Sequence, residues 1–183
     1  MSLTYNNLDT LTRQLMVEEL NLDISLNKLY QGKRLTPYGL QDWPLALRTA
    51  FEAGSDSTLE VWLSQPGRLE TTEQYTRNGI TRSKAVPVTA ARTFAEGEFN
   101  RFYIRGVCRQ AMNLKNAGVG AGMVTVYRAR YSENPRPESI ALDGTQIDAN
   151  SLLLDLRENA SVDGINTALG LPPGPNSGMS VRL

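Results

Sequence analysis

Apolar residues recur at helical spacing over residues 93–117, the longest stretch of this kind in the chain. Successive members are four, four, four and three positions apart, which places them on one face of a helix. They are Phe99, Tyr103, Val107, Ala111 and Leu114. Thr93 and Glu96 have the spacing of a capping box, and Gly118 is a suitable residue to end the helix. Gly106, in its middle, favours close approach of another backbone.

The first third of the chain has the same periodicity in shorter pieces, which predicts three or four short helices. Asn7 precedes the first, and a break near Asn21 would separate it from the second. Asp42 is the expected N-cap of the third, and Ser57 with Glu60 forms the expected capping box of the fourth. The expected helices cover residues 7–20, 22–30, 42–54 and 57–65.

Alternating and β-branched residues predict a small antiparallel β element. Asn78–Gly79 is a strong hairpin turn between Tyr75–Thr76 and Ile80–Thr81. Residues 123–131 give the clearest strand. Residues 140–147 read as a second small hairpin around Asp143–Gly144.

Near the end of the chain, Asp148 is an expected helix cap, and the helix continues to about Arg157. Residues 165–169 would add a helical turn, and residues 179–183 a short strand.

Prolines and glycines concentrate in residues 171–183, which cannot form a helix. We therefore expect one α+β domain over residues 1–170, mainly helical, followed by an extended C-terminal arm. Such an arm is either fixed on its own domain or exchanged with a neighbouring subunit, as in closed rings and shells. The residues expected to contact a partner are Pro172, Pro173, Pro175, Met179 and Val181.

Charge is distributed unevenly although the chain as a whole is neutral. Residues 1–66 carry 5 basic and 8 acidic groups, residues 67–137 carry 12 and 5, and residues 138–183 carry 2 and 6. Either the acidic ends neutralise the basic middle, within one chain or between copies, or the middle presents a basic patch to a partner.

Arg101, Arg105 and Arg109 follow one another at intervals of four and therefore line up along the central helix. One interpretation is a solvated face with ion pairs such as Glu98–Arg101. The other is a row of guanidinium groups that meets an anionic partner. Four further arginines would assist it: Arg77, Arg82, Arg128 and Arg130.

The chain contains no histidine, which removes the usual general base and metal ligand. The carboxylate pairs Glu96–Glu98 and Asp143–Asp148 are better explained as caps, turn residues and favourable charges at helix ends. The single cysteine, Cys108, has the spacing of a buried residue. We expect no enzyme, no metal and no cofactor.

No apolar run is long enough to cross a membrane, and the first residues lack the features of a signal peptide. A virion or cytoplasmic location is expected.

Three functions remain open. The leading hypothesis is a structural subunit that contacts copies of itself and neighbouring structural proteins, such as a neck, connector or capsid-associated protein of a tailed phage. The second is a nucleic-acid-binding module that uses residues 93–117. The third is a carboxylate-based enzyme such as a metal-dependent nuclease.

Overall fold

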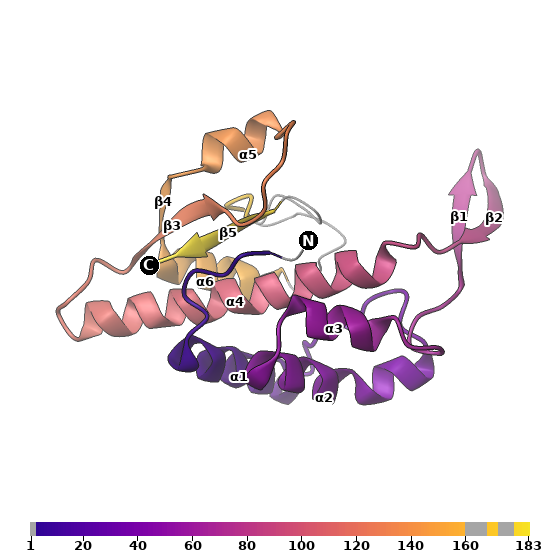
Figure 1. Cartoon of the computed structure of the whole chain (residues 1–183), viewed down its shortest axis with the longest axis horizontal. Helices are drawn as coiled ribbons and strands as arrows, with labels where there is room; N and C mark the ends of the chain where they lie inside the picture. Colours follow the sequence, from indigo (N-terminus) through magenta and orange to yellow (C-terminus); the bar gives the residue numbers. More distant parts are fainter. Residues whose placement is uncertain (1–2, 160–167, 172–177) are drawn as a thin grey trace.

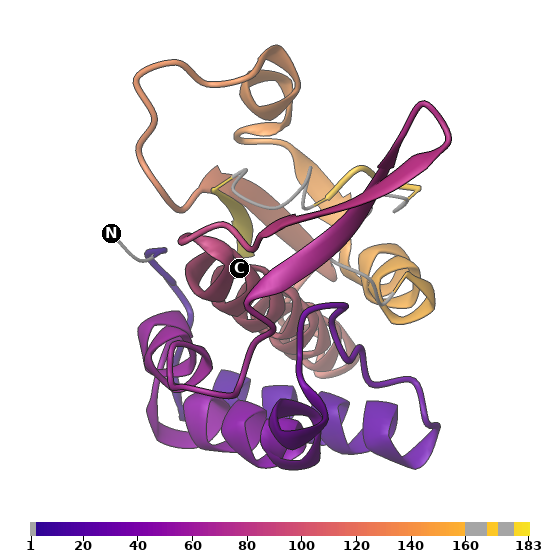
Figure 2. The ribbon, with the colours of Figure 1, turned by 90° about the vertical axis from the view of Figure 1, so that its right-hand side faces the viewer.

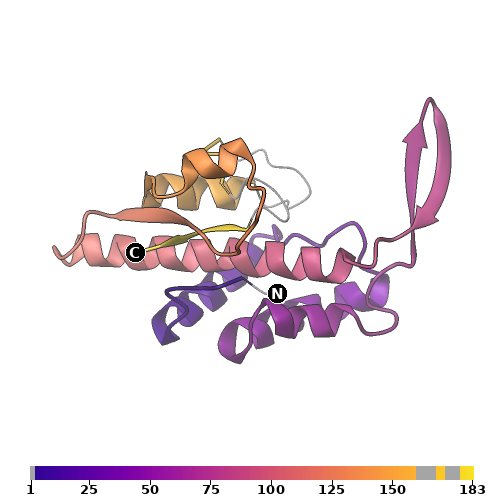
Figure 3. The same cartoon turned by 45° about the horizontal axis from the view of Figure 1, so that its top comes forward.

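The computed structural model describes residues 3–159, 168–171 and 178–183, and it confirms an α+β fold around a long central helix (Figure 1). This helix, α4 (Ala90–Asn116), separates two layers. On one side lie α1 (Thr10–Ser25), α2 (Pro37–Ala53) and α3 (Asp56–Leu63). On the other side a three-stranded sheet and α6 (Ala149–Glu158) cover it (Figure 3).

Side-chain caps fix where the N-terminal helices begin. The Asp9 carboxylate accepts from the backbone N–H of Thr12 at 2.8 Å, and the Thr36 hydroxyl accepts from that of Gly39 at 2.9 Å. Ser55, not Ser57, caps α3. The predicted break near Asn21 is wrong because α1 continues to Ser25, and α2 begins five positions before Asp42.

The predicted hairpin is confirmed, and its strands are longer than expected. Strands β1 (Thr72–Arg77) and β2 (Ile80–Ala85) pair antiparallel across a two-residue turn. Asn78 and Gly79 have φ values of 53° and 74°, which this kind of turn requires at both positions. The hairpin forms a sheet of its own and projects from the body (Figure 1), and in Figure 2 it faces the viewer.

The three-stranded sheet has the order β4–β3–β5 and is antiparallel throughout. Its members are β3 (Met123–Arg128), β4 (Gln146–Asp148) and β5 (Met179–Arg182). The predicted second hairpin is only half correct, since residues 140–142 belong to a short helix, α5 (Pro137–Leu142). Asp148 caps α6 as expected, accepting from the Ser151 N–H at 2.8 Å.

The core surrounds α4, and residues 98–108 of this helix are all buried. Phe99, Phe102 and Tyr103 have no exposed surface. The expected start of the helix is wrong, because α4 begins at Ala90 and both Thr93 and Glu96 lie inside it. The predicted close approach at Gly106 is confirmed: a Cβ there would lie 3.0 Å from the backbone oxygen of Thr12 on α1.

Both ends of the chain lie at the three-stranded sheet. The Thr4 N–H donates to the Ala129 carbonyl at 2.9 Å, and the Leu183 N–H donates to the Asn7 side chain at 3.1 Å. Leu171, where the expected arm would begin, is fully buried in the core. The segment 171–183 is therefore part of the body at both of its described ends.

Candidate functional site

The predicted row of arginines on α4 does not form a surface. The side chains of Arg101 and Arg105 are 2% and 0% exposed, because the two layers of the fold enclose this helix on all sides. Only Arg109, with a side chain 28% exposed, reaches solvent. The expectation that Arg101 and Arg105 meet an anionic partner is therefore corrected.

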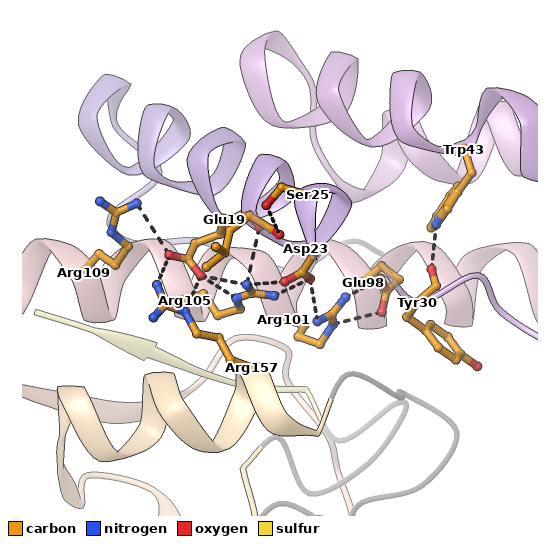
Figure 4. A network of polar contacts seen from close by, with 11 residues as sticks. Glu19, Asp23, Ser25, Tyr30, Trp43, Glu98, Arg101, Arg105, Arg109 and Arg157 are labelled. Carbon is orange, nitrogen blue, oxygen red and sulfur yellow. Dashed lines mark hydrogen bonds and ion pairs between the residues drawn. The ribbon is translucent and has the colours of Figure 1, made fainter. Parts of the chain in front are cut away.

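These arginines instead pair with buried carboxylates of α1 and of α4 itself (Figure 4). Arg105 pairs with Glu19 and Asp23 of α1, each at 2.7 Å. Arg101 pairs with Glu98 at 2.9 Å, as the sequence suggested. Because a buried charge is costly unless it is paired and hydrogen-bonded, each carboxylate here needs its guanidinium.

Glu19 is the centre of this network and joins three helices. Arg105 and Arg109 of α4 and Arg157 of α6 all approach its carboxylate. Burial acts to raise the pKa of Glu19, but hydrogen bonds and charge from Arg157 and Arg105 lower it overall. Burial raises the pKa of Glu98, which has a single arginine beside it. The network holds the two layers together, and its two buried arginines, Arg101 and Arg105, are unavailable to a ligand.

The C-terminal residues expected to contact a partner are also used internally. Met179 and Val181 are fully buried and belong to β5, which pairs with β3 of the same chain. The Asn100 side-chain amide donates to the Met179 carbonyl at 2.8 Å. Pro172, Pro173 and Pro175 lie outside the described residues. The contacts of Met179 and Val181 correct the expected exchange of this strand.

The hairpin β1–β2 is a part of the described chain that remains available for an interaction. Eleven of its twelve strand residues are exposed, so neither face packs on the body. The antiparallel register sorts its side chains into two faces. One face is uncharged and carries Thr72, Gln74, Thr76, Thr81, Ser83 and Ala85; the other carries Glu73, Tyr75, Arg77, Ile80, Arg82 and Lys84.

The base of the hairpin is fixed to the body. Glu73 accepts from Arg34 at 2.7 Å and pairs with Lys84 at 3.0 Å. These two cations lower the pKa of the Glu73 carboxyl. The Val86 N–H donates to the Thr71 carbonyl at 2.9 Å and closes the base. The hairpin is therefore anchored at one end and open at the other.

Arg77 and Arg82 occupy the free half of the charged face. Tyr75 lies directly opposite Arg82, and Ile80 lies opposite Arg77. Both guanidiniums lack a carboxylate partner within the part of the chain that the structure describes. The free half thus combines positive charge with an aromatic and an aliphatic side chain, a mixture suited to a protein interface.

Arg128 and Arg130 lie at the end of β3, away from the hairpin. With Arg136 they line a hollow of about 230 Å³ between this strand and α5. Sequence reasoning missed Arg136 and Ser139, which complete the lining. Only the proline on each side of Arg136 signalled that the chain turns back here.

The described residues contain no group of metal-ligating side chains and no helix that could span a membrane. Comparison with family models, with curated proteins and with solved structures finds no match for this chain.

Proposed function

We propose that this chain is a non-enzymatic structural subunit of an assembly built from copies of itself, in which the β1–β2 hairpin holds a neighbouring copy. The observation that carries the proposal is the exposure of the hairpin on both faces. A two-stranded hairpin alone is marginally stable in water, and open strand edges invite pairing with another chain. A contact with a neighbouring copy would stabilise the hairpin and cover its open strand edges.

The charge pattern favours a second copy as the neighbour. Arg77 and Arg82 need negative charge that their own body does not bring to them. Residues 1–66 and 138–183 carry an acidic excess, so another copy offers complementary surface. The helices α2 and α3 belong to this acidic part, and they carry exposed apolar side chains, such as Leu45 and Val61, as well as Glu52 and Glu60.

For the setting, we propose the tailed-phage virion that the sequence suggested, with a role in the neck, the connector or the capsid. Such particles are closed symmetric assemblies, in which an element that extends from each subunit to the next locks the ring or shell. In this proposal the hairpin takes the role first expected of the C-terminal arm.

A hairpin deletion tests the proposal. Because Thr71 and Val86 are hydrogen-bonded at the base, residues 72–85 can be replaced by two glycines without moving the body. The full chain should form a multimer by light scattering, and the deletion should be monomeric with an unchanged thermal midpoint. A full chain that is monomeric at its highest soluble concentration, or a deletion that still assembles, would overturn the proposal.

Point substitutions refine the test. Arg77→Glu with Arg82→Glu should weaken the multimer, because each change places a negative charge where complementarity requires a positive one. Lys28→Glu with Lys115→Glu is the matched control, since it changes the net charge equally and both lysines are exposed outside the hairpin, α2 and α3. Equal loss of assembly in both variants would show a nonspecific effect of net charge and contradict a role of the hairpin face.

A further inference from the structure

The hollow between β3 and α5 has the composition of an oxyanion site. Its lining residues include the guanidiniums of Arg128, Arg130 and Arg136, the amide residue Asn134 and the hydroxyl residue Ser139. The residues of this lining come from the strand end, the following loop and α5, so the turn of the chain at residues 131–136 brings them together.

One of the three arginines is already neutralised. Arg130 Nη1 lies 2.8 and 2.7 Å from the two carboxylate oxygens of Glu96. That bond holds the Arg130 side chain against α4 and fixes one wall of the hollow. Arg130 therefore forms part of the wall of the hollow, and the net positive charge of the hollow comes from Arg128 and Arg136.

Arg128 and Arg136 have no carboxylate partner in residues 3–159, 168–171 and 178–183. The neighbouring acids Glu133 and Glu138 do not line the hollow. Two guanidiniums in one hollow repel each other unless an anion lies between them. Their donors suit an oxyanion, because the guanidinium fork matches paired oxygens.

Ser139 adds a hydroxyl to the wall of this hollow. The residue as a whole is only 2% exposed, but its hydroxyl is not a buried atom without a partner; within the described residues those are Tyr5 Oη and Arg101 Nη1. The hydroxyl can therefore donate into the hollow.

We propose that this hollow binds a phosphoryl group. A tetrahedral phosphate presents oxygens in several directions and can accept from Arg128, Arg136 and Ser139 together, whereas the two oxygens of a carboxylate lie in one plane. The group is either a free phosphate or nucleotide, or a phosphodiester of nucleic acid. This site is separate from the hairpin and does not depend on its role in assembly.

Binding to the full chain tests the proposal, with inorganic phosphate and a single-stranded oligonucleotide as the two probes. Titration calorimetry should show saturable binding of at least one probe. Arg136→Ala should weaken it by roughly tenfold or more, the effect of losing hydrogen bonds to a charged group. Arg136 is exposed, so this variant leaves the core intact. Ser139→Ala should weaken binding by a smaller factor, and Arg48→Ala, on α2, should leave it unchanged.

The two probes distinguish a small phosphate ligand from the backbone of a nucleic acid. Tight oligonucleotide binding that falls steeply with salt, and that Arg128→Gln also weakens, identifies a nucleic-acid backbone. Saturable phosphate binding without oligonucleotide binding identifies a small ligand. Absence of saturable binding by either probe, or binding that a folded Arg136→Ala variant retains in full, would overturn the site.

Discussion

The environment of Arg105 is determined by residues that lie far from it in the sequence. Its spacing from Arg101 and Arg109 correctly aligned the three side chains along one helix. Its partners Glu19 and Asp23 precede it by 86 and 82 positions, and no local rule connects them. The alternative of a solvated, ion-paired row was therefore closer to the structure than an anionic partner, although the pairs are buried.

Replacing Arg105 with methionine should destabilise the protein by about 3–5 kcal/mol, because it leaves Glu19 and Asp23 buried with too little positive charge. Urea unfolding followed by circular dichroism measures this loss. Arg48→Met, which removes an exposed pair with Glu52 and an exposed hydrogen bond to Asn21, should cost no more than about 1 kcal/mol. If a variant of Arg105 is as stable as the parent, the cost of removing these charged groups from water equals the stabilisation that their ion pairs provide.

The buried acids should also shape the dependence of stability on pH. The pKa of Glu19 is lower in the folded protein than in the unfolded chain, so the folded state loses stability as pH falls through that lowered pKa. The pKa of Glu98 is raised in the folded protein, so its effect on stability has the opposite sign. It disfavours folding as pH rises above the ordinary pKa of a glutamate. Glu19→Gln should flatten the acid side of the stability curve.

Unfolding of Glu19→Gln, Glu98→Gln and the parent across the acid range provides the measurement. Glu98→Gln should make the loss of stability on acidification steeper, because the compensating proton uptake is gone. Equal slopes for all three proteins would contradict the assignment.

At the scale of elements, periodicity predicted the helices, the Asn78–Gly79 hairpin and strand β3, because each depends on neighbouring residues. It failed where tertiary packing decides. Residues 140–142 looked like a strand, but Pro137 favours the first turn of a helix and α5 forms instead. The helix α4 starts before Thr93, because Ala90 and Ala95 are buried against the body.

Gly106→Ala tests the close contact between α1 and α4. The added Cβ would lie 3.0 Å from the Thr12 carbonyl oxygen and 3.1 Å from Met16 Cγ, contacts that force the helices apart. Overpacking costs about 1–3 kcal/mol, and alanine's better helix propensity returns about 1 kcal/mol, so a net loss of up to about 2 kcal/mol is expected. Thermal unfolding measures it, and Asn113→Ala, at an exposed position of the same helix, should not destabilise. A gain in stability for Gly106→Ala would contradict tight packing here.

At the scale of the whole molecule, the sequence predicted a mainly helical α+β domain and placed basic residues on the hairpin correctly. It left open whether the C-terminal arm joins its own domain or a neighbouring subunit, because the sequence of a terminal strand does not indicate which sheet it joins. In the structure, this strand pairs with β3 of the same chain, and its residues Met179 and Val181 are buried there. The hollow lined by Arg136 also escaped the sequence, since its members lie on three elements.

Removal of residues 179–183 should therefore unfold the body and not simply release subunits. The truncation removes one neighbour of β3 and the two buried apolar side chains Met179 and Val181, each worth about 1.5–3 kcal/mol. A lower thermal midpoint is expected, with faster hydrogen exchange at Thr125 and Tyr127, which lie opposite Arg182 and Ser180 of β5. A truncated chain with the parental midpoint but no assembly would instead support exchange of the strand.

The late position of β5 in the chain also bears on biosynthesis. During translation, α1 and α4 can pair as soon as residue 116 has left the ribosome, whereas one edge of β3 stays bare until residues 179–182 emerge. The nascent protein thus passes through a stage in which an uncovered strand and the projecting hairpin are both present, and chaperone binding during that interval would protect it from premature association.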